Sequence, residues 1–581
     1  MAHLKKFNEV ISKKILVLSA VVGIVAGLGA LLFYTLLHLL SQVFLGYICN
    51  FHPPSPAGET LLINLHLTTN GEFRRWLLIL IPTLGGLICG LIVYTFAPEA
   101  EGHGTDAVIE AIHAKGGRIR GRVPIVKTIA SAITIGSGGS AGREGPIAQI
   151  GAGFASLLAQ KLKLSAKERE LLVICGAAAG IGSIFKAPFG GAFFGIEVLY
   201  KRDYEVEAFI PTIVSSFIAY SVFSAITGWQ PIFFAPPYSF NPFEMPFFAL
   251  LGIISGLLGI LYVKVFYGLR DNFFKRLQIP DQLKPAIGGF LLGLVAYFFP
   301  YVLGPGYGWL QWSLEGKLAL SIMIILIFAK ILATSFTISS GGSGGVFAPS
   351  VFIGAMLGGI LGKTFQMFFP TIVVKPEIFA LIGMAAFFSG TAKVPISPII
   401  MVSEMTGDYN ILIPAILAST MAYLVSGDYT IYEKQVLTRA DSPAHIPELL
   451  SDILSSLRVK DAMTKNVITI EPSATIDDLE KLINKTGHLG FPVVNEKGEL
   501  VGIVTYEDVM KVRPEERHAK KVEDIETRKL IVAYPNETLD AVLRKIVIHD
   551  ISRLPVVDPN DPKKLLGIIT RYDIAKAIHV K

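Results

Sequence analysis

The chain has 581 residues, of which 52% are hydrophobic and only 17% are charged, whereas ordinary soluble domains contain about 25% charged residues. Its net charge is only +6, and no dense basic run is interleaved with aromatic residues; this excludes a nucleic-acid-binding protein. The charged residues are concentrated in roughly the last 140 positions. We therefore expect a membrane part followed by a soluble part.

The N-terminal segment predicts a first membrane helix. An apolar run from Ile15 to about Cys49 is far longer than the core of a cleavable signal. It is preceded by four lysines, Lys5, Lys6, Lys13 and Lys14. Because positive residues favour the cytoplasmic side, we expect a multi-pass protein of the cell membrane with its N-terminus and its soluble tail in the cytoplasm.

Further apolar stretches recur near 76–97, 122–135, 146–163, 171–200, 208–228, 246–268, 285–303, 319–338, 346–369, 376–404 and 410–426. Several are too short to cross about 30 Å of hydrocarbon. Glycine-rich breaks at 136–140 and 339–345 interrupt the two halves of this region. In lipid, irregular backbone survives only where it is buried in protein or lines a polar cavity, and paired breaks are typical of a midplane site. The sequence therefore predicts a transporter or channel core.

The composition becomes polar near residue 441, and from about 457 short strands alternate with helices. This α/β tail repeats itself, since 459–463, 491–494 and 502–505 are echoed by 522–525, 554–557 and 567–570 after roughly 62 residues. We therefore divide the chain into a membrane domain (1–440), a linker (441–456) and two similar modules (457–515 and 516–581).

The first glycine-rich break leads into the motif Gly142-Arg143-Glu144-Gly145-Pro146. Proline suits the first turn of a helix, and the amides of a helix N-terminus attract an anion. A carboxylate inside the membrane is costly unless it has a role. Glu144 is therefore a candidate gate that competes with a permeating anion. The alternative is a structural ion pair between Arg143 and Glu144.

The second break ends in Gly344-Gly345-Val346-Phe347-Ala348-Pro349-Ser350. The amides of Val346 and Phe347 would give a second set of positive dipole ends in the same cavity. Two such helix ends at one point make an anion site, although glycine-rich helix packing produces similar strings.

Together with Gly102-His103-Gly104, these two motifs resemble the three signature loops of the CLC family of chloride channels and chloride/proton antiporters. The resemblance covers about residues 15–440. It implies an all-α polytopic membrane protein, built as an inverted repeat of tilted, partly re-entrant helices. It also implies a homodimer surrounded by lipid, with a chloride pore in each subunit and gating of the kind found in voltage-gated channels.

The resemblance assigns the external gate to Glu144 and the anion contacts to His103, Gly145, Val346, Phe347 and Tyr432. Tyr432 resembles the pore-lining tyrosine whose hydroxyl caps the anion. Many relatives have a serine where this chain has His103, so the donor at this position is a titratable imidazole. The anion preference is therefore left open.

The antiporters of the family often have a glutamate near the end of the helix that follows an Ala-Pro pair, and it accepts protons from the inside. Here Ala187-Pro188 leads to Glu197-Val198, and Val198 takes that place. Valine carries no proton, which favours a channel. Glu197 stays a candidate for a proton pathway, and a chloride/proton antiporter of the same fold is the alternative.

The tail resembles a tandem pair of CBS domains, because each module ends in Gly-x-x-Thr-x-x-Asp. That family uses the aspartate for ribose hydroxyls and the threonine for phosphate, which is sound chemistry for a carboxylate. The resemblance implies an ATP, ADP or AMP site at Thr505, Asp508, Thr570 and Asp573. Segments 489–491 and 551–553 would flank the base and the phosphate. The alternative is a pair that only packs and dimerises.

The remaining motifs predict neither an enzyme nor a metal site, and no cofactor is required. The chain contains no hydrolase triad, zinc-protease motif or dinucleotide fingerprint in a credible context. The string 358–364 is interpreted as helix packing rather than a phosphate loop. A helix from about Thr105 would present four polar residues on a solvated face, namely His103, Asp106, Glu110 and His113. More distant alternatives are a divalent-cation channel and a nucleotide-sensing membrane scaffold.

Overall fold

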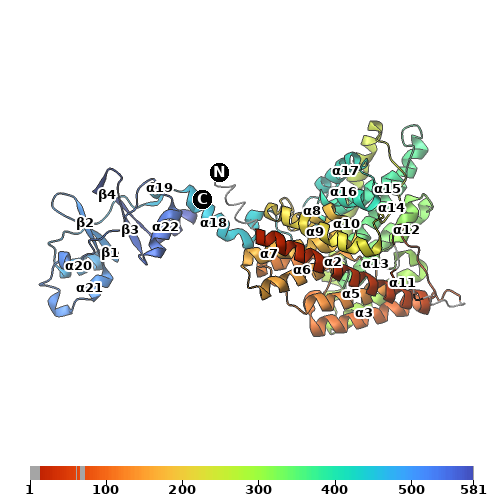
Figure 1. Ribbon diagram of the computed structural model, residues 1–581, viewed down its shortest axis with the longest axis horizontal. Coiled ribbons are helices and arrows are strands. Elements are labelled where there is room, and N and C mark those ends of the chain that lie inside the picture. The colour runs from red at the N-terminus through yellow and green to blue at the C-terminus, as the bar shows by residue number, and fades with distance from the viewer. Residues whose placement is uncertain (1–12, 60–61, 64, 66–71, 580–581) are drawn as a thin grey trace. The chain divides into compact units, whose positions relative to one another are not determined.

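The computed structural model describes residues 13–59, 62–63, 65 and 72–579, and the chain divides into two compact units between Ala444 and His445 (Figure 1). Lys5 and Lys6 lie outside the described residues. Lys13 is the first residue of helix α2, and Nζ of Lys14 lies 2.8 Å from a carboxylate oxygen of Glu168. The beginning of α2 is thus held by an ion pair.

The first unit is helical. Its α-helices are α2 (Lys13–Ser41), α3 (Leu77–Phe96), α4 (Thr105–Lys115), α5 (Val123–Gly136), α6 (Glu144–Lys161), α7 (Ala166–Ile184), α8 (Pro188–Glu197), α9 (Phe209–Thr227), α10 (Met245–Asn272), α11 (Lys284–Phe298), α12 (Tyr307–Leu314), α13 (Leu320–Ser339), α14 (Phe347–Phe368), α15 (Ile378–Ala392), α16 (Ser397–Thr406) and α17 (Leu412–Val425). A π-helical segment, η1 (Gln42–Ile48), continues α2. The segment 358–364 lies within α14, as expected for helix packing.

Six helical segments of the described chain are long and apolar enough to cross a membrane: Lys13–Ile48, Leu77–Phe96, Val206–Thr227, Pro242–Arg276, Leu320–Ser339 and Phe347–Phe368. Three shorter apolar helices, α5, α15 and α17, are too short to span about 30 Å of hydrocarbon on their own. This mixture of long and short helices agrees with the predicted partly re-entrant architecture.

Two of the apolar stretches each form two helices. The stretch 171–200 forms α7 and α8, and the stretch 376–404 forms α15 and α16. At the breaks Lys186 and Lys393 adopt φ angles of 52° and 58°, in the left-handed region. Prolines occupy the first turns of α8 and α16. A proline cannot continue a preceding helix, so each break starts a new helix inside the membrane unit.

The two halves of the membrane unit repeat each other with an offset of about 203 residues. Lys127 on α5 donates to two carbonyl oxygens before α4, and Lys330 on α13 does the same before α12. The hydroxyls of Ser131 and Ser343 lie 2.9 Å apart. Those of Ser140 and Thr334, the equivalent pair in reverse order, lie 3.0 Å apart. Contacts between the halves are thus related by a two-fold axis.

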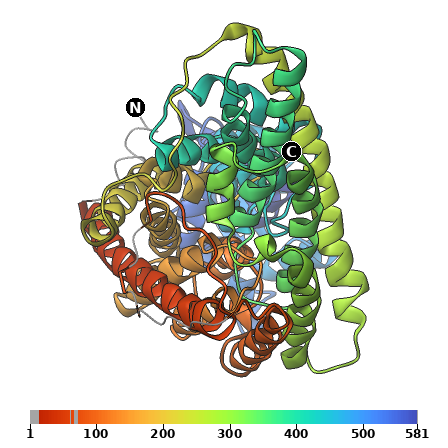
Figure 2. The same cartoon turned by 90° about the vertical axis from the view of Figure 1, so that its right-hand side faces the viewer.

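Glycines let helices in each half approach closely. A Cβ added at Gly151 of α6 would overlap the carbonyl oxygen of Gly176 of α7. In the second half a Cβ at Gly354 of α14 would overlap the carbonyl oxygen of Gly383 of α15. Backbone contact of this kind is typical of helix packing in membranes. Figure 2 shows the red and orange helices of the first half beside the green and teal helices of the second.

The second unit contains α18 (Ile446–Ser456), α19 (Val459–Ala462), α20 (Ile476–Thr486), β1 (Gly490–Val494), β2 (Leu500–Thr505), α21 (Tyr506–Met510), α22 (Leu539–Ile548), β3 (Arg553–Asp558), β4 (Asp561–Thr570) and α23 (Arg571–His579). Strand β1 pairs antiparallel with β2, and β3 pairs antiparallel with β4. Gly490 lies opposite Thr505, and Arg553 lies opposite Thr570 at the equivalent position. The two modules therefore share one design, and each has its own apolar core.

Candidate functional site

The two glycine-rich breaks meet in the membrane unit. The amide of Gly142 donates to the carbonyl oxygen of Gly345 at 2.7 Å, and the amide of Gly345 donates to the carbonyl oxygen of Gly142 at 2.7 Å. Helix α6 begins two residues after Gly142, and α14 begins two residues after Gly345. The positive ends of both helix dipoles therefore lie at one place.

Glu144, the first residue of α6, is 2% exposed and reaches the start of α14. Its Oε1 accepts a hydrogen bond of 2.5 Å from the amide of Phe347. Its Oε2 has no hydrogen-bond partner among the described residues. A Cβ added at Gly142 or at Gly345 would overlap the carboxylate. The glycines of the two breaks therefore form a cradle of the size of this carboxylate.

Arg143 is paired with Glu59 rather than with Glu144. Its Nη1 donates to Oε1 of Glu59, and its guanidinium stacks over three aromatic rings, those of Tyr34, Phe185 and Tyr307. A buried arginine that is paired and stacked in this way is strongly held. The Arg143–Glu144 ion pair considered above is therefore wrong, and no cationic side chain of the described residues forms a hydrogen bond with the Glu144 carboxylate.

His103 and Tyr432, far apart in sequence, lie side by side with ring centroids 5.3 Å apart. Tyr432 is fully buried, and its hydroxyl has no partner in the described part of the chain. Nε2 of His103 lies 3.2 Å from Oδ2 of Asp106, whereas Nδ1 has no partner within the same described residues. A hydroxyl and a ring nitrogen are thus left unpaired in a buried place, which is rare without a ligand.

The expected solvated face is wrong for two histidines, His103 in the loop before α4 and His113 on α4. His103 is 7% exposed and His113 is 6% exposed. The ring nitrogens of His113 lie 2.7 Å from the hydroxyl of Ser442 and 3.0 Å from the carbonyl oxygen of Leu199. Tertiary packing buries this face of the helix, and His113 serves as a structural link.

The remaining predicted contacts also lie at these helix ends. Gly145 is in the first turn of α6, and a Cβ added there would overlap the carbonyl oxygen of His103. Val346 is the residue before α14 and is buried. The structure thus gathers His103, Gly145, Val346 and Phe347 around Glu144, and Tyr432 lies against His103.

Sequence reasoning missed Lys127, which is fully buried on α5. Its Nζ donates to the carbonyl oxygens of Ala100 and Gly102, at 3.0 and 2.8 Å. It therefore holds the loop that carries His103. The signal was available, because a lysine inside an apolar membrane segment is a functional hypothesis by default.

Glu197 of α8 and Glu404 of α16 occupy equivalent positions in the two halves of the membrane unit. At the end of α8, the two carboxylate oxygens of Glu197 accept from the amides of Ile396 and Ser397, at 2.8 and 2.7 Å. Glu404 of α16, which sequence reasoning missed, accepts from the amides of Phe189 and Gly190, at 3.1 and 2.8 Å. Each glutamate thus caps the N-terminus of the other's helix, as expected for a carboxylate near a positive dipole end.

In the second unit a cavity of about 450 Å³ lies between the two modules, and it contains Thr570 and Asp573. Residues Leu489–Phe491 line it, as do Ser552 and Arg553 from the segment 551–553. Thr505 and Asp508 are not among its lining residues. The two copies of the Thr-x-x-Asp motif are therefore in different environments.

Both copies form helix caps. Oδ2 of Asp508 accepts from the amide and hydroxyl of Thr505, and Oδ2 of Asp573 accepts likewise from Thr570. Oδ1 of Asp508 also binds Lys511, at 2.8 Å. Burial raises the pKa of Asp508, but its bonds to Lys511 and Thr505 outweigh burial and hold that pKa below its usual value. The carboxylate of Asp508 is therefore already engaged within the chain.

The chain is similar in sequence to known proteins. Residues 85–427 match the model of the voltage gated chloride channel family, and residues 459–515 and 522–580 match the CBS domain. The chloride channel protein CLC-e of Arabidopsis thaliana is 27% identical, over 98% of this chain and 77% of its own. The H(+)/Cl(-) exchange transporter ClcA of Vibrio parahaemolyticus is 28% identical, over 75% of this chain and 93% of its own.

Solved structures show the same fold. The crystal structure of a slow cyanobacterial Cl-/H+ antiporter superimposes with a TM-score of 0.62 at 22% identity, covering 72% of this chain and 95% of that one. The region matched by the family model includes His103, Glu144 and Phe347. The chain therefore belongs to the CLC family of anion transport proteins, as a multi-pass membrane protein that carries a pair of CBS domains.

Proposed function

We propose that the protein transports chloride through a path gated by Glu144. The observation that carries this proposal is the Glu144 carboxylate on the amide of Phe347, inside a cradle of glycines. Two converging helix ends favour a negative charge, and the carboxylate takes that position. Chloride displaces the carboxylate, or a proton neutralises it, and the path then opens.

The central anion contacts we propose are His103, Gly145, Val346, Phe347 and Tyr432. The unpaired hydroxyl of Tyr432 supports this set, because it can donate to an anion. Nδ1 of His103 is also unpaired, and it donates only when both ring nitrogens carry a hydrogen, because Nε2 faces the carboxylate of Asp106. Backbone and hydroxyl dipoles bind an ion strongly enough to replace part of its water yet weakly enough to release it.

Passive conduction is the form of transport that the geometry favours slightly. Val198 is apolar, and Glu197 is occupied as a helix cap with an equivalent in Glu404. A structural role that both halves share explains Glu197 without proton transfer. The alternative is a chloride/proton antiporter, which the name of the exchange transporter of Vibrio parahaemolyticus favours.

For the CBS pair we propose an adenine nucleotide, ATP, ADP or AMP, in the cavity that contains Thr570 and Asp573. Oδ1 of Asp573 accepts no hydrogen bond from the described chain and is available to a ribose hydroxyl, and Arg553 and Arg571 line the same cavity. The nucleotide regulates transport if it binds the two gating states with different affinity. We further propose a homodimer in the cell membrane with the CBS pair in the cytoplasm.

The test is chloride efflux from liposomes that hold the full chain, with wild type compared against Glu144→Gln. Efflux from wild type that exceeds the leak of protein-free liposomes, and responds to pH only while Glu144 is present, supports the proposal. Equal pH dependence in both proteins overturns the assignment of the gate. Proton movement recorded at the same time separates the channel from the antiporter.

A further inference from the structure

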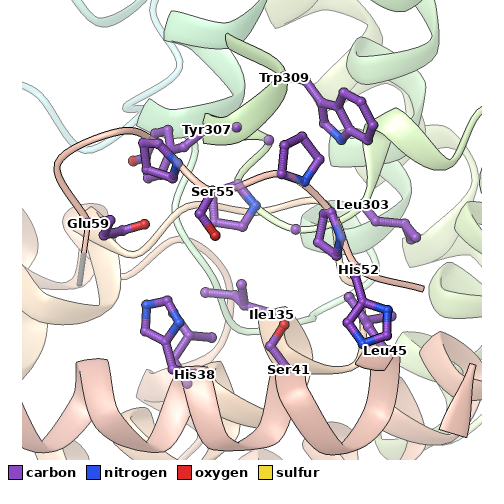
Figure 3. Close-up of a pocket in the computed structure, with 18 of the residues that line it drawn as sticks. His38, Ser41, Leu45, His52, Ser55, Glu59, Ile135, Leu303, Tyr307 and Trp309 are labelled. Atoms are coloured by element: carbon purple, nitrogen blue, oxygen red, sulfur yellow. The ribbon is translucent and has the colours of Figure 1, made fainter. Parts of the chain in front are cut away.

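A cavity of about 340 Å³ lies on one side of Arg143, the neighbour of Glu144 (Figure 3). Its walls come from α2, from η1, from the segment 51–56 with Glu59, and from the segment 303–309. Cavities of roughly 300 Å³ and above hold small organic ligands, and they are mostly apolar with a few polar groups that fix orientation. This cavity has that composition and is larger than a chloride ion requires.

Three buried polar atoms of its lining residues have no hydrogen-bond partner among the described residues. They are Nε of Arg143, Nε2 of His38 and the hydroxyl of Tyr307. Arg143 is 2% exposed and Tyr307 is 4% exposed. In Figure 3 the side chains of His38 and Tyr307 enter the same cavity from opposite walls. A buried unpaired polar atom is costly, and three of them around one cavity point to a ligand that pairs with them.

All three atoms can donate. The guanidinium Nε always carries a hydrogen, the phenol carries one, and the imidazole donates through Nε2 when its other nitrogen accepts or is protonated. Glu59 lines the same cavity, but its carboxylate already binds Nη1 of Arg143. The acid therefore neutralises the arginine without occupying Nε. Because the Arg143–Glu59 pair has no net charge, the three unpaired donors can accommodate one further negative charge, that of a single anionic group.

The rest of the wall is apolar and partly aromatic. It is formed by side chains that include those of Leu45, Phe51, Pro54 and Trp309. Such a surface gains free energy by covering an apolar body. An inorganic anion would leave this wall uncovered, whereas a carboxylate on a ring would use both parts of the cavity.

We propose that this cavity is a binding site for small monocarboxylates with a compact apolar body, of the benzoate type. The carboxylate pairs with Nε of Arg143, the hydroxyl of Tyr307 and Nε2 of His38, and the ring lies against Trp309. Because Arg143 precedes Glu144 in the chain, a bound carboxylate alters anion passage from this side. The effect on anion passage rests on the proposed function, whereas the binding of the carboxylate does not.

The test is calorimetry on the purified full chain in detergent with three probes of nearly one shape. Benzoate carries the anionic group, benzamide is its neutral counterpart, and benzylamine carries a positive charge. Saturable binding of benzoate that is at least about tenfold tighter than that of the other two supports the site, since hydrogen bonds to a charged group contribute about 1.5–3 kcal/mol. No saturable binding of benzoate, equal binding of benzamide, or tighter binding of benzylamine overturns it.

Two variants locate the site, and one controls for nonspecific effects. Tyr307→Phe and His38→Leu each remove one donor, and each weakens benzoate binding about tenfold. Tyr297→Phe, the same chemical change at an exposed position of α11, leaves binding unchanged. Benzoate binding that persists unaltered in both donor variants overturns the assignment. Because no flux is measured, a protein that transports nothing still binds benzoate, so failure of this proposal and failure of the transport proposal are distinguishable.

Discussion

Oε1 of Glu144 accepts a hydrogen bond from the amide of Phe347, although the two residues are 203 positions apart in the chain. Each is the first residue of a helix, α6 or α14, and the two helices are equivalent members of the inverted repeat. The proposed gate and the proposed anion-binding amide are therefore contributed by the two halves of one two-fold arrangement. Any movement of the carboxylate exposes that amide directly.

Glu144→Gln removes the charge at nearly constant shape. We expect chloride flux through the variant to lose its dependence on pH on the side of the gate, because the neutral amide mimics a protonated carboxylate. Flux from liposomes is measured at several external pH values. Glu110→Gln, a change at a partly exposed carboxylate of α4, is the control and keeps the pH dependence of wild type. A variant at Glu144 that titrates like wild type refutes the gate.

Tyr432→Phe removes the unpaired hydroxyl and keeps the ring that packs against His103. We expect chloride binding to the full chain to weaken about tenfold, since a hydrogen bond to an anion contributes about 1.5–3 kcal/mol. Calorimetry with chloride measures the change, and Tyr297→Phe is again the matched control. Unchanged chloride affinity in Tyr432→Phe would remove the tyrosine from the proposed site.

Glu197→Gln and Glu404→Gln each replace a carboxylate that accepts from two helix amides. Because charge-assisted caps are stronger than neutral ones, we expect both variants to be less stable by about 1–3 kcal/mol. Thermal unfolding in detergent measures the loss. Similar losses in the two variants fit a shared structural role.

The same two variants separate this role from proton transfer. If Glu197 carries protons, Glu197→Gln stops proton movement while chloride still flows, and Glu404→Gln does not. We expect no such difference between the variants. Its observation, by simultaneous chloride and pH recording, would establish Glu197 as part of a proton pathway and favour the antiporter.

Asp573→Ala removes the carboxylate that lies in the cavity of the CBS pair. We expect it to abolish measurable binding of ATP, ADP and AMP to the full chain, because its Oδ1 is available to a ribose hydroxyl. Asp508→Ala should have a smaller effect, since that carboxylate already binds Thr505 and Lys511. Calorimetry compares the two variants. Equal losses would mean that both motifs hold nucleotide, and no binding by wild type would refute the nucleotide site.

The helix breaks beside Gly142 and Gly345 could be predicted, because glycine-rich strings inside apolar sequence have few stable settings in a membrane. Their mutual pairing could not, since it depends on how the two halves pack. Hydropathy alone does not mark the additional breaks at Lys186 and Lys393, because these apolar stretches continue across them. Only the left-handed backbone and the following prolines mark the ends of α7 and α15.

Individual residues of the site could be predicted from the sequence, but the side chains and backbone groups that they contact could not. Glu144 and Phe347 follow from intramembrane charge and helix ends, whereas the partner of Arg143 is Glu59, in a loop with no motif. The role of Lys127 is likewise set by carbonyl groups of another segment. Packing between the modules decides which of the two similar Thr-x-x-Asp motifs faces a cavity. The sequence alone therefore predicts the same role for both motifs.

Chloride transport through the path at Glu144 is tested most directly by chloride efflux from liposomes that hold the purified full chain, with extravesicular pH recorded at the same time. We expect chloride release well above that of protein-free liposomes, without a stoichiometric movement of protons. Chloride release coupled to proton movement would show that the protein is an antiporter and not a channel. No chloride release above the leak of protein-free liposomes would contradict chloride transport through this path.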